Sequence, residues 1–442
     1  MIKKAVEECK KINEEYHYFN HVIENPKHEE KGKLENIFVS VKDCICVKNV
    51  PSSAGSAIIK NYKPLFDATV VERIKKEGGI IIGKTSQDEF GFGGFSINTG
   101  IGFEIPLNPF DKERAAGGSS GGAAGITQKA SFRHIAISES TGGSIVNPAC
   151  FCGVYGLCPT YGRVSRYGLI DYANSLDKIG IMAKNIEDIA LMLKVISGFD
   201  EKESTSSDVE VTNYENFLKK DIKEMRIGII KDAFGEGTDE EIKKIIKEKI
   251  AELEKHGAII EEISLPITFK YALACYYILA LSEASTNLAK YCGMRYGEDE
   301  KLEGRNFNYY FKDVRSKNFG KEAKRRIILG TFARMSGYRD AYYIKSAKVR
   351  TMIIEEYQQA FENFDVLLSP TMPVIAPKIK DVEKLTPLQN YMMDILTVGP
   401  NLAGLPHISI PAGFVKGMPV GLMLIGNHFD EGKILQVGEK IR

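Results

Sequence analysis

Glycine and serine residues gather in two runs that could support nucleophilic chemistry. The first run reads GGSSGG at residues 117–122, and the second reads TGGSI at residues 141–145. A glycine lacks the Cβ that would keep the backbone away from a reacting carbonyl, and a serine hydroxyl can act as a nucleophile or proton relay. A Gly/Ser run alone is more typical of a flexible linker. However, residues 134–137 between the runs have a buried-strand pattern, and residues 150–157 are small and mainly apolar, which favours a folded site.

Acyl transfer suits these runs better than phosphate binding does. A P-loop would need a Gly-Lys-Ser/Thr ending after Gly122, and a dinucleotide site would need a strand directly before its glycines. A serine nucleophile also needs a base, and none of the seven histidines has an obvious place for that role. Lysine can serve when it is desolvated enough to be neutral. Lys42, at the end of an apolar strand, is the candidate base, although its position alone allows a solvated surface charge equally well.

Composition predicts a folded protein with a sizeable core. Of its 442 residues, 43% are apolar and 26% are charged. The net charge of +1 gives no global nucleic-acid footprint, so any RNA contact is expected to be local or to belong to a partner. No apolar stretch is long enough to cross a bilayer, and the first eight residues are charged and amphipathic rather than signal-like. We therefore expect a cytoplasmic protein without membrane contacts.

The cysteine pattern favours free thiols over a disulfide scaffold or a metal site. Eight cysteines are few for a chain of this length, and a reducing compartment would keep them as thiols. The pairs Cys44/Cys46 and Cys150/Cys152 have C-x-C spacing, but few histidines accompany them. Small buried side chains are the better interpretation. We expect no metal on this chain.

Strand and helix patterns alternate along the chain and predict an α/β fold. The long polar run at residues 200–208 is loop-like but does not divide the chain, so one domain over residues 1–442 is expected, with a sheet that collects strands from both ends of the sequence. The expected helices are at 1–23, 68–77, 240–255, 271–289 and within 321–361. The expected strands are at 37–41, 80–82, 134–137, 226–230, 258–263, 366–368, 408–410 and 421–425.

Six motifs in order along the chain resemble the amidase signature family. They are VKD at 41–43, GKT at 83–85, GGSSGG at 117–122, TGGSI at 141–145, FCGVYGL at 151–157 and PTYGRVS at 159–165. The resemblance implies one α/β domain with a central mixed β-sheet flanked by helices on both faces. It also implies a Ser-cisSer-Lys triad in which Lys42 is the base, Ser119 adjoins a cis peptide and Ser144 is the nucleophile. The backbone N–H groups of Thr141, Gly142 and Gly143 would form the oxyanion hole.

A second group of motifs is similar to the glutamine-hydrolysing subunits of tRNA-dependent amidotransferases. These motifs lie at 276–277, 283–289, 293–297, 320–327, 391–394 and 401–406. The resemblance implies that Arg326 pairs with the α-carboxylate of glutamine, Asp394 with its α-ammonium group, and that Tyr276 lines the pocket. One fixed cation and one fixed anion suit a zwitterion. Without the resemblance, a surface arginine and a helix-capping aspartate would be the favoured interpretations.

The same resemblance implies that other subunits carry out part of the reaction. This chain would release ammonia from glutamine, and a second subunit would use it to amidate Glu-tRNA(Gln) or Asp-tRNA(Asn). ATP and Mg²⁺ are expected on that second subunit, and no cofactor is expected on this chain. The misacylated tRNA would be held mainly by the second subunit, and a small third subunit would bridge the other two. Two alternatives stay open: a free-standing amidase for a small or fatty amide, and a noncatalytic scaffold subunit.

Three positions depart from the family pattern close to the predicted triad. Aligned on residues 141–144, the usual aspartate falls at Ser140 and the usual arginine at Val146, and one extra residue lies between the two runs. Glu139 is a candidate substitute for the missing acid. These changes favour the scaffold alternative because they touch the residues that orient the oxyanion loop, whereas the presence of Lys42, Ser119 and Ser144 favours catalysis.

Overall fold

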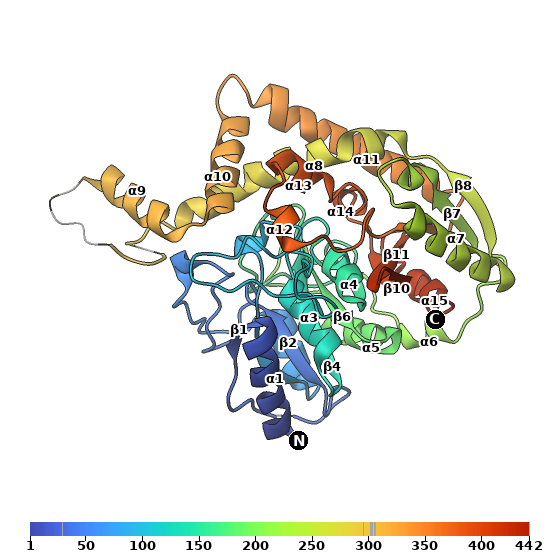
Figure 1. The fold of residues 1–442 in the computed structure, drawn as a ribbon, viewed down its shortest axis with the longest axis horizontal. Coiled ribbons are helices and arrows are strands. Elements are labelled where there is room, and N and C mark those ends of the chain that lie inside the picture. The colour runs from blue at the N-terminus through green and yellow to red at the C-terminus, as the bar shows by residue number, and fades with distance from the viewer. Residues whose placement is uncertain (29, 295, 301–303, 305, 442) are drawn as a thin grey trace.

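Eleven strands form a single mixed sheet in the computed structural model, which describes residues 1–28, 30–294, 296–300, 304 and 306–441 (Figure 1). Arg295, within the predicted 293–297 motif, lies outside the described residues. In spatial order the strands are β1 (Phe19–Val22), β3 (Ile80–Thr85), β2 (Phe38–Lys42), β4 (His134–Ser140), β6 (Lys178–Ala183), β5 (Tyr155–Cys158), β10 (His407–Val415), β11 (Met418–Gly426), β9 (Val366–Pro370), β7 (Arg226–Ile230) and β8 (Ile259–Ile263).

Strand direction decides which loops meet at the edge of the sheet. β2 lies between β3 and β4 and runs parallel to both, while β4 is antiparallel to β6. Parallel neighbours bring their carboxyl ends to the same edge of a sheet. Lys42, the last residue of β2, therefore lies at the same edge as Ser140, the last residue of β4, and the second Gly/Ser run begins there.

Helices flank the sheet, and the predicted α/β class is confirmed. α8 packs against both α10 and α11 along the upper side of Figure 1, and α3 packs against α1 and α4. In the part of the chain that is described, we find no helix with both the length and the apolar character needed to cross a membrane. The helices are α1 (Ile2–Tyr16), α2 (Thr69–Lys76), α3 (Gly121–Lys129), α4 (Val146–Cys152), α5 (Ile186–Ile196), α6 (Glu215–Leu218), α7 (Glu240–Lys255), α8 (Pro266–Asn287), α9 (Phe307–Asn318), α10 (Lys321–Arg334), α11 (Lys345–Phe361), α12 (Ile379–Val382), α13 (Pro387–Met392), α14 (Val398–Leu402) and α15 (Glu431–Gly438).

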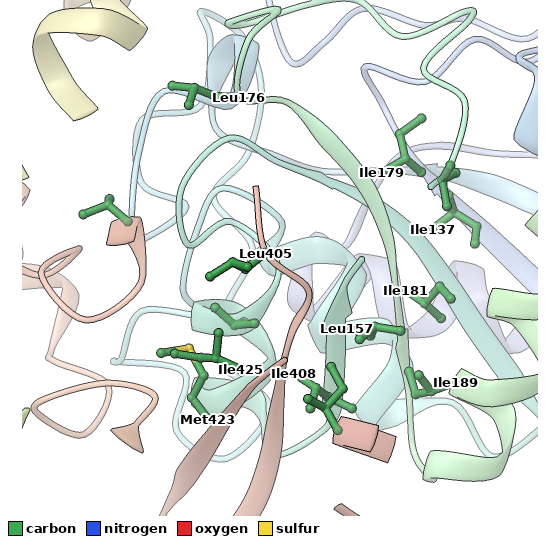
Figure 2. Packing of buried hydrophobic residues seen from close by; sticks show 14 of the residues in the cluster. Ile137, Leu157, Leu176, Ile179, Ile181, Ile189, Leu405, Ile408, Met423 and Ile425 are labelled. Atoms are coloured by element: carbon green, nitrogen blue, oxygen red, sulfur yellow. The ribbon is translucent and has the colours of Figure 1, made fainter. Parts of the chain in front are cut away.

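The main hydrophobic core joins strands from both halves of the chain. Figure 2 shows Ile137, Leu157 and Ile181 of the first half in one cluster with Ile408 and Ile425 of the second half. The link is direct, because β5 pairs antiparallel with β10. The expectation that the sheet collects strands from distant parts of the sequence is confirmed. Such burial, at about 25 cal/mol per Å² of apolar surface, is the main force that fixes this arrangement.

Three helix predictions differ from the structure, one of them only in its bounds, since the helix predicted at 271–289 is α8 (Pro266–Asn287). The helix predicted at 1–23 ends at Tyr16 rather than near residue 23, because His17 takes a left-handed conformation and the chain then pairs with β3 as strand β1. The helical region at 321–361 is divided: α10 ends at Arg334, and a π-helical turn (Asp340–Ile344) leads into α11.

α3 was not predicted from the sequence, because its glycine-rich start resembles a loop. Its glycines allow a close approach instead. A Cβ on Gly125 would lie 2.1 Å from the Tyr18 ring, and one on Gly122 would lie 2.6 Å from the carbonyl oxygen of Ser86. The first Gly/Ser run is therefore packed between neighbouring elements and is not a free linker.

Candidate active site

Lys42 is a buried side chain in contact with the first Gly/Ser run. Its Nζ donates hydrogen bonds to Ser119 Oγ at 2.7 Å, to the Glu139 carbonyl oxygen at 2.9 Å and to Glu139 Oε2 at 2.9 Å. No part of the Lys42 side chain is exposed. The surface-charge interpretation of Lys42 is therefore wrong. The structure brings together an amine and a hydroxyl at a distance that allows direct proton transfer.

Ser119 lies at the start of α3, where the backbone is tightly packed. The Gly118–Ser119 peptide bond is cis. Gly117 has φ +81°, and a Cβ there would lie 2.6 Å from Pro148 Cα in the first turn of α4. The Gly/Ser run therefore packs directly against the helix that follows Ser144, which brings the two runs together.

The second Gly/Ser run forms the turn between β4 and α4. Ser144 is only 6% exposed. A Cβ on Gly142 would lie 2.9 Å from the Tyr276 hydroxyl, and one on Gly143 would lie 2.5 Å from Thr397 Oγ1, so both glycines are needed for close approach. Within the described residues, the backbone N–H groups of Thr141, Gly142 and Gly143 donate no hydrogen bond to the protein. They are available for a negatively charged oxygen.

Residues that depart from the family pattern take defined places around this turn. Ser140 Oγ donates to the Gly142 carbonyl oxygen at 3.0 Å, and Val146 is fully buried among apolar side chains. Glu139 projects its carboxylate toward Lys42, and its other oxygen accepts a hydrogen bond from Thr141 Oγ1 at 2.7 Å. Glu139, the candidate substitute acid, therefore contacts both Lys42 and Thr141 at this edge of the sheet.

Asp177 is a site residue that was not singled out from the sequence. Its Oδ1 lies 2.7 Å from Thr141 Oγ1, and its Oδ2 accepts the backbone N–H groups of Tyr172 and Ala173 at 2.9 Å. Asp177 is fully buried, and this burial together with the charge of Glu139 raises its pKa well above the ordinary range. Asp177 directly precedes β6, so the β4–β6 pairing was the signal that could have located it.

Arg326 is buried, and the partly buried Asp394 carboxylate accepts a side-chain hydroxyl rather than a helix N–H, so the surface and helix-cap interpretations are wrong. Arg326, on α10, donates from Nε to Glu322 Oε1 at 2.9 Å and from Nη1 to the Tyr172 hydroxyl at 2.7 Å. Asp394 accepts a hydrogen bond from the Tyr277 hydroxyl at 2.5 Å. Burial raises the pKa of Asp394, while this hydrogen bond and Arg326 oppose the rise.

Aromatic side chains connect these two charged residues. The Arg326 guanidinium lies over the rings of Phe92, Tyr172, Tyr277 and Tyr391, at 5.2 to 5.8 Å from their centroids. Tyr276, the aromatic residue predicted from the sequence, packs edge-to-face on Tyr277 with 5.0 Å between ring centroids. Tyr391 begins the 391–394 motif noted in the sequence, whereas Tyr172 lies in none of the quoted motifs, so only the fold identifies Tyr172 as a neighbour of the charged pair.

The charged pocket and the Lys42–Ser119 pair adjoin each other. A Cβ on Gly91 would lie 3.5 Å from Ser119 Oγ and 3.6 Å from the Tyr172 ring. A cavity of about 60 Å³ opens beside Arg326, Tyr277 and Gly94. A larger cavity of about 760 Å³ is lined by Tyr62, Asp171 and Tyr291 among others, and it contains none of the predicted site residues. The small cavity is therefore the relevant one, because Arg326, one of the predicted site residues, lines it together with the oppositely charged Glu322.

This arrangement of a mixed sheet, a buried lysine–serine pair and two Gly/Ser turns is that of an amidase. Residues 6–435 match the amidase family, and the chain belongs to it.

Individual relatives show which members of the amidase family this chain is similar to. The chain is 46% identical over 441 residues to the A subunit of glutamyl-tRNA(Gln) amidotransferase from Persephonella marina, covering 100% of this chain and 88% of the relative. It is 48% identical over 406 residues to the subunit of the same name from Halothermothrix orenii, covering 92% of this chain and 84% of the relative. The crystal structure of the corresponding A subunit of glutamyl-tRNA(Gln) amidotransferase from Thermotoga maritima is similar with a TM-score of 0.84 at 35% identity, covering 99% of this chain and 90% of that chain.

Proposed function

We propose that this chain is the glutamine-hydrolysing A subunit of a glutamyl-tRNA(Gln) amidotransferase. The observation that carries the proposal is that buried Arg326 and partly buried Asp394 both contact Tyr277, in a pocket that adjoins the Lys42–Ser119 hydrogen bond. The similarity to subunits of that name over nearly the whole chain supports it. A cation and an anion at the ends of one aromatic pocket suit a free amino acid, whereas a fatty amide needs neither.

In the proposed reaction, Ser144 Oγ attacks the side-chain amide carbon of glutamine. Its proton passes to Ser119, and Ser119 passes its own proton to a neutral Lys42. The backbone N–H groups of residues 141–143 hold the oxyanion, where the loss of one donor typically lowers the rate by about 10²- to 10³-fold. The relay then returns the proton to the departing ammonia. Water hydrolyses the acyl-enzyme by the same route and releases glutamate.

Substrate orientation in this proposal comes from the second half of the chain. Arg326 pairs with the α-carboxylate of glutamine, and Asp394 pairs with its α-ammonium group. Tyr276 lies between this pocket and Gly142, where it lines the path of the side chain toward the oxyanion turn. Charge-assisted contacts of this kind are each worth roughly 1.5 to 3 kcal/mol.

The use of ammonia is assigned to other subunits. We propose a cytoplasmic complex with the B and C subunits of the amidotransferase, in which residues 1–442 act as one domain and need no cofactor or metal. The B subunit would hold ATP, Mg²⁺ and the misacylated tRNA, which is Glu-tRNA(Gln) or Asp-tRNA(Asn). The names of the relatives support the coarser statement that such a subunit belongs to an amidotransferase.

A reconstituted complex tests the assignment of the nucleophile. Ser144→Ala is expected to abolish glutamine-dependent amidation of misacylated tRNA and to leave ammonia-dependent amidation intact, because alanine removes only one oxygen. Ser120→Ala, a buried serine of the first run outside the relay, is the matched control and should retain both activities. Survival of glutamine-dependent amidation in Ser144→Ala contradicts the proposal. Loss of ammonia-dependent amidation in an assembled complex shows a wider role for Ser144.

A noncatalytic scaffold is the second candidate, and one specific observation favours it. The Glu139 carboxylate lies 2.9 Å from Lys42 Nζ, and an anion at that distance favours the ammonium form, which cannot accept a proton. Incubation with a glutamine-derived electrophile separates the two candidates. A covalent adduct on Ser144, detected by mass spectrometry, supports the amidase, and an unmodified Ser144 supports the scaffold.

A further inference from the structure

The Thr141 hydroxyl lies between two buried carboxyl groups. Its Oγ1 is 2.7 Å from Glu139 Oε1 and 2.7 Å from Asp177 Oδ1. A hydroxyl has one hydrogen to donate, and an ionised carboxylate only accepts. With both carboxyl groups ionised, one of the two short contacts would join oxygens with no hydrogen between them. The geometry therefore requires a proton on Glu139 or on Asp177.

The surroundings of the two carboxyl groups are unequal. Glu139 Oε2 contacts Lys42 Nζ at 2.9 Å. Asp177 accepts backbone N–H groups. Its pKa is raised mainly by burial and, to a smaller extent, by repulsion from Glu139. Burial also raises the pKa of the nearby thiols, which are therefore neutral. Other titratable and charged groups also face this cluster. They are Lys42 and Cys44 at the end of β2, Asp88 in the loop after β3, Cys158 on β5, Arg166 between β5 and β6, and Lys178 on β6.

We propose that Glu139 and Asp177 share one proton through the Thr141 hydroxyl, and that the position of this proton sets how strongly Lys42 retains its own. In the first arrangement, Asp177 Oδ1–H donates to Thr141 Oγ1, and Thr141 donates to Glu139 Oε1. Glu139 is then a carboxylate and holds Lys42 as an ammonium group. Glu139, Thr141 and Asp177 are thus positioning residues that act through Lys42.

In the second arrangement, the proton has moved along the same three groups. The Asp177 O–H bond breaks as an O–H bond forms at Thr141 Oγ1, and the original Thr141 hydrogen moves to Glu139 Oε1, so the total charge is unchanged. Lys42 then faces an uncharged acid, and the negative charge is one hydroxyl further away. Its ammonium group is then no longer stabilised by an adjacent carboxylate, and transfer of its proton to water leaves the amine that the relay requires.

This inference rests on the proposed function, because it concerns the base of that reaction. It also reconciles the Glu139–Lys42 contact with catalysis, since the contact need not hold Lys42 permanently as an ammonium group. The departure at Ser140, with Glu139 as the acid beside it, therefore becomes a means of setting the pH range in which this chain is active.

Two isosteric variants test the inference by opposite shifts in the pH profile of kcat/KM for glutamine. In Asp177→Asn the amide N–H₂ donates to Thr141, so Glu139 stays a carboxylate. The rise of kcat/KM with increasing pH, here called the alkaline activation, should then occur about one pH unit or more higher than in the wild type. In Glu139→Gln the charge is absent, so the activation should move down by a similar amount. Asp200→Asn, a buried aspartate held by the hydroxyls of Thr69 and Ser165, is the matched control and should not shift the profile.

Infrared spectroscopy tests the shared proton without any activity. At about pH 8.5, above the pKa values of Asp88 and Glu89, the wild-type protein should show a carboxylic-acid C=O band that Asp177→Asn lacks. A wild type that hydrolyses no glutamine contradicts the proposed function, and the infrared band then decides the inference separately. Equal losses of kcat/KM in both variants with unmoved pH profiles, or no difference in the infrared band, overturn the inference.

Discussion

Glu89 joins the helix that carries Arg326 to the N-terminal half of the chain. Its Oε2 accepts the backbone N–H of Gly320, the residue at the N-cap of α10, at 2.8 Å, and its Oε1 accepts the Ser56 hydroxyl at 2.5 Å. Burial raises the pKa of Glu89 to about 7, and the two hydrogen bonds oppose the rise only in part. We predict that Glu89→Gln changes how the stability of the protein depends on pH.

The magnitude follows from the difference between the folded and unfolded pKa values. Unfolded, Glu89 has its ordinary pKa of 4.5, so between pH 4.5 and about 7 the folded state binds a proton that the unfolded state releases. Its contribution to stability is therefore fully present below pH 4.5 and is lost as the pH rises through 7. A difference of about 2.5 in pKa corresponds to about 3 kcal/mol. Glutamine keeps an acceptor for Gly320 and does not ionise, so the variant should not suffer this loss.

Urea unfolding followed by circular dichroism at about pH 5 and about pH 8 measures this effect. Relative to the wild type, the free energy of unfolding of Glu89→Gln should rise by about 2.5 kcal/mol between the two pH values, because a small part of the loss has already occurred at pH 5. Glu236→Gln, at an exposed glutamate, is the matched control and should show no such change. A constant difference between Glu89→Gln and the wild type, or a relative loss for the variant at the higher pH, would refute the reasoning.

Three further predictions concern the proposed site. Lys42→Arg should lower glutamine hydrolysis at least about 10²-fold, because a guanidinium group stays protonated, and should leave the circular dichroism spectrum unchanged. Ammonia release near the wild-type rate would contradict the assignment of Lys42 as the base. Asp394→Ala should raise the KM for glutamine by about one to two decades and affect an analogue without the α-amino group less; equal effects on both substrates indicate a structural role. Gly142→Ala places a Cβ 2.9 Å from the Tyr276 hydroxyl and should lower kcat, whereas Gly237→Ala, with open space around it, should not; equal kcat values refute the close-approach argument.

The sequence was sufficient to predict the part of the site that local patterns encode. An apolar strand ending in Lys42, and Gly/Ser runs on either side of another apolar strand, placed three chemically useful segments at strand or helix ends. The parallel pairing of β2 and β4 then brings two of those ends to one edge of the sheet. Strand ends in an α/β fold are predictable because hydrophobic runs fix the strands and polar residues mark where each one stops.

Contacts between segments far apart in the sequence could not be predicted in the same way. Glu139 meets Lys42 across 97 residues, and Arg326 meets Tyr172 across 154 residues. Neither contact leaves a periodic signal, because each depends on how the loops close over the edge of the sheet. The same reason explains strand β1: residues 19–22 form a strand only because the edge of β3 is available to pair with them.

In the proposed reaction, the two halves of the chain contribute different parts of the site, one for the chemistry and the other for recognition of the amino acid. Lys42, Ser119 and the oxyanion turn belong to the first 150 residues, whereas Arg326 and Asp394 belong to the helical region above the sheet. The two parts meet, for example, where Gly142 packs against Tyr276, and Glu89 accepts the backbone N–H at the start of α10. Substitutions in the helical region can therefore change which amide is held while the proton relay stays in place. Substitutions at Glu139 or Asp177 should instead change the pH range of the relay and leave the recognition of the amino acid unaffected.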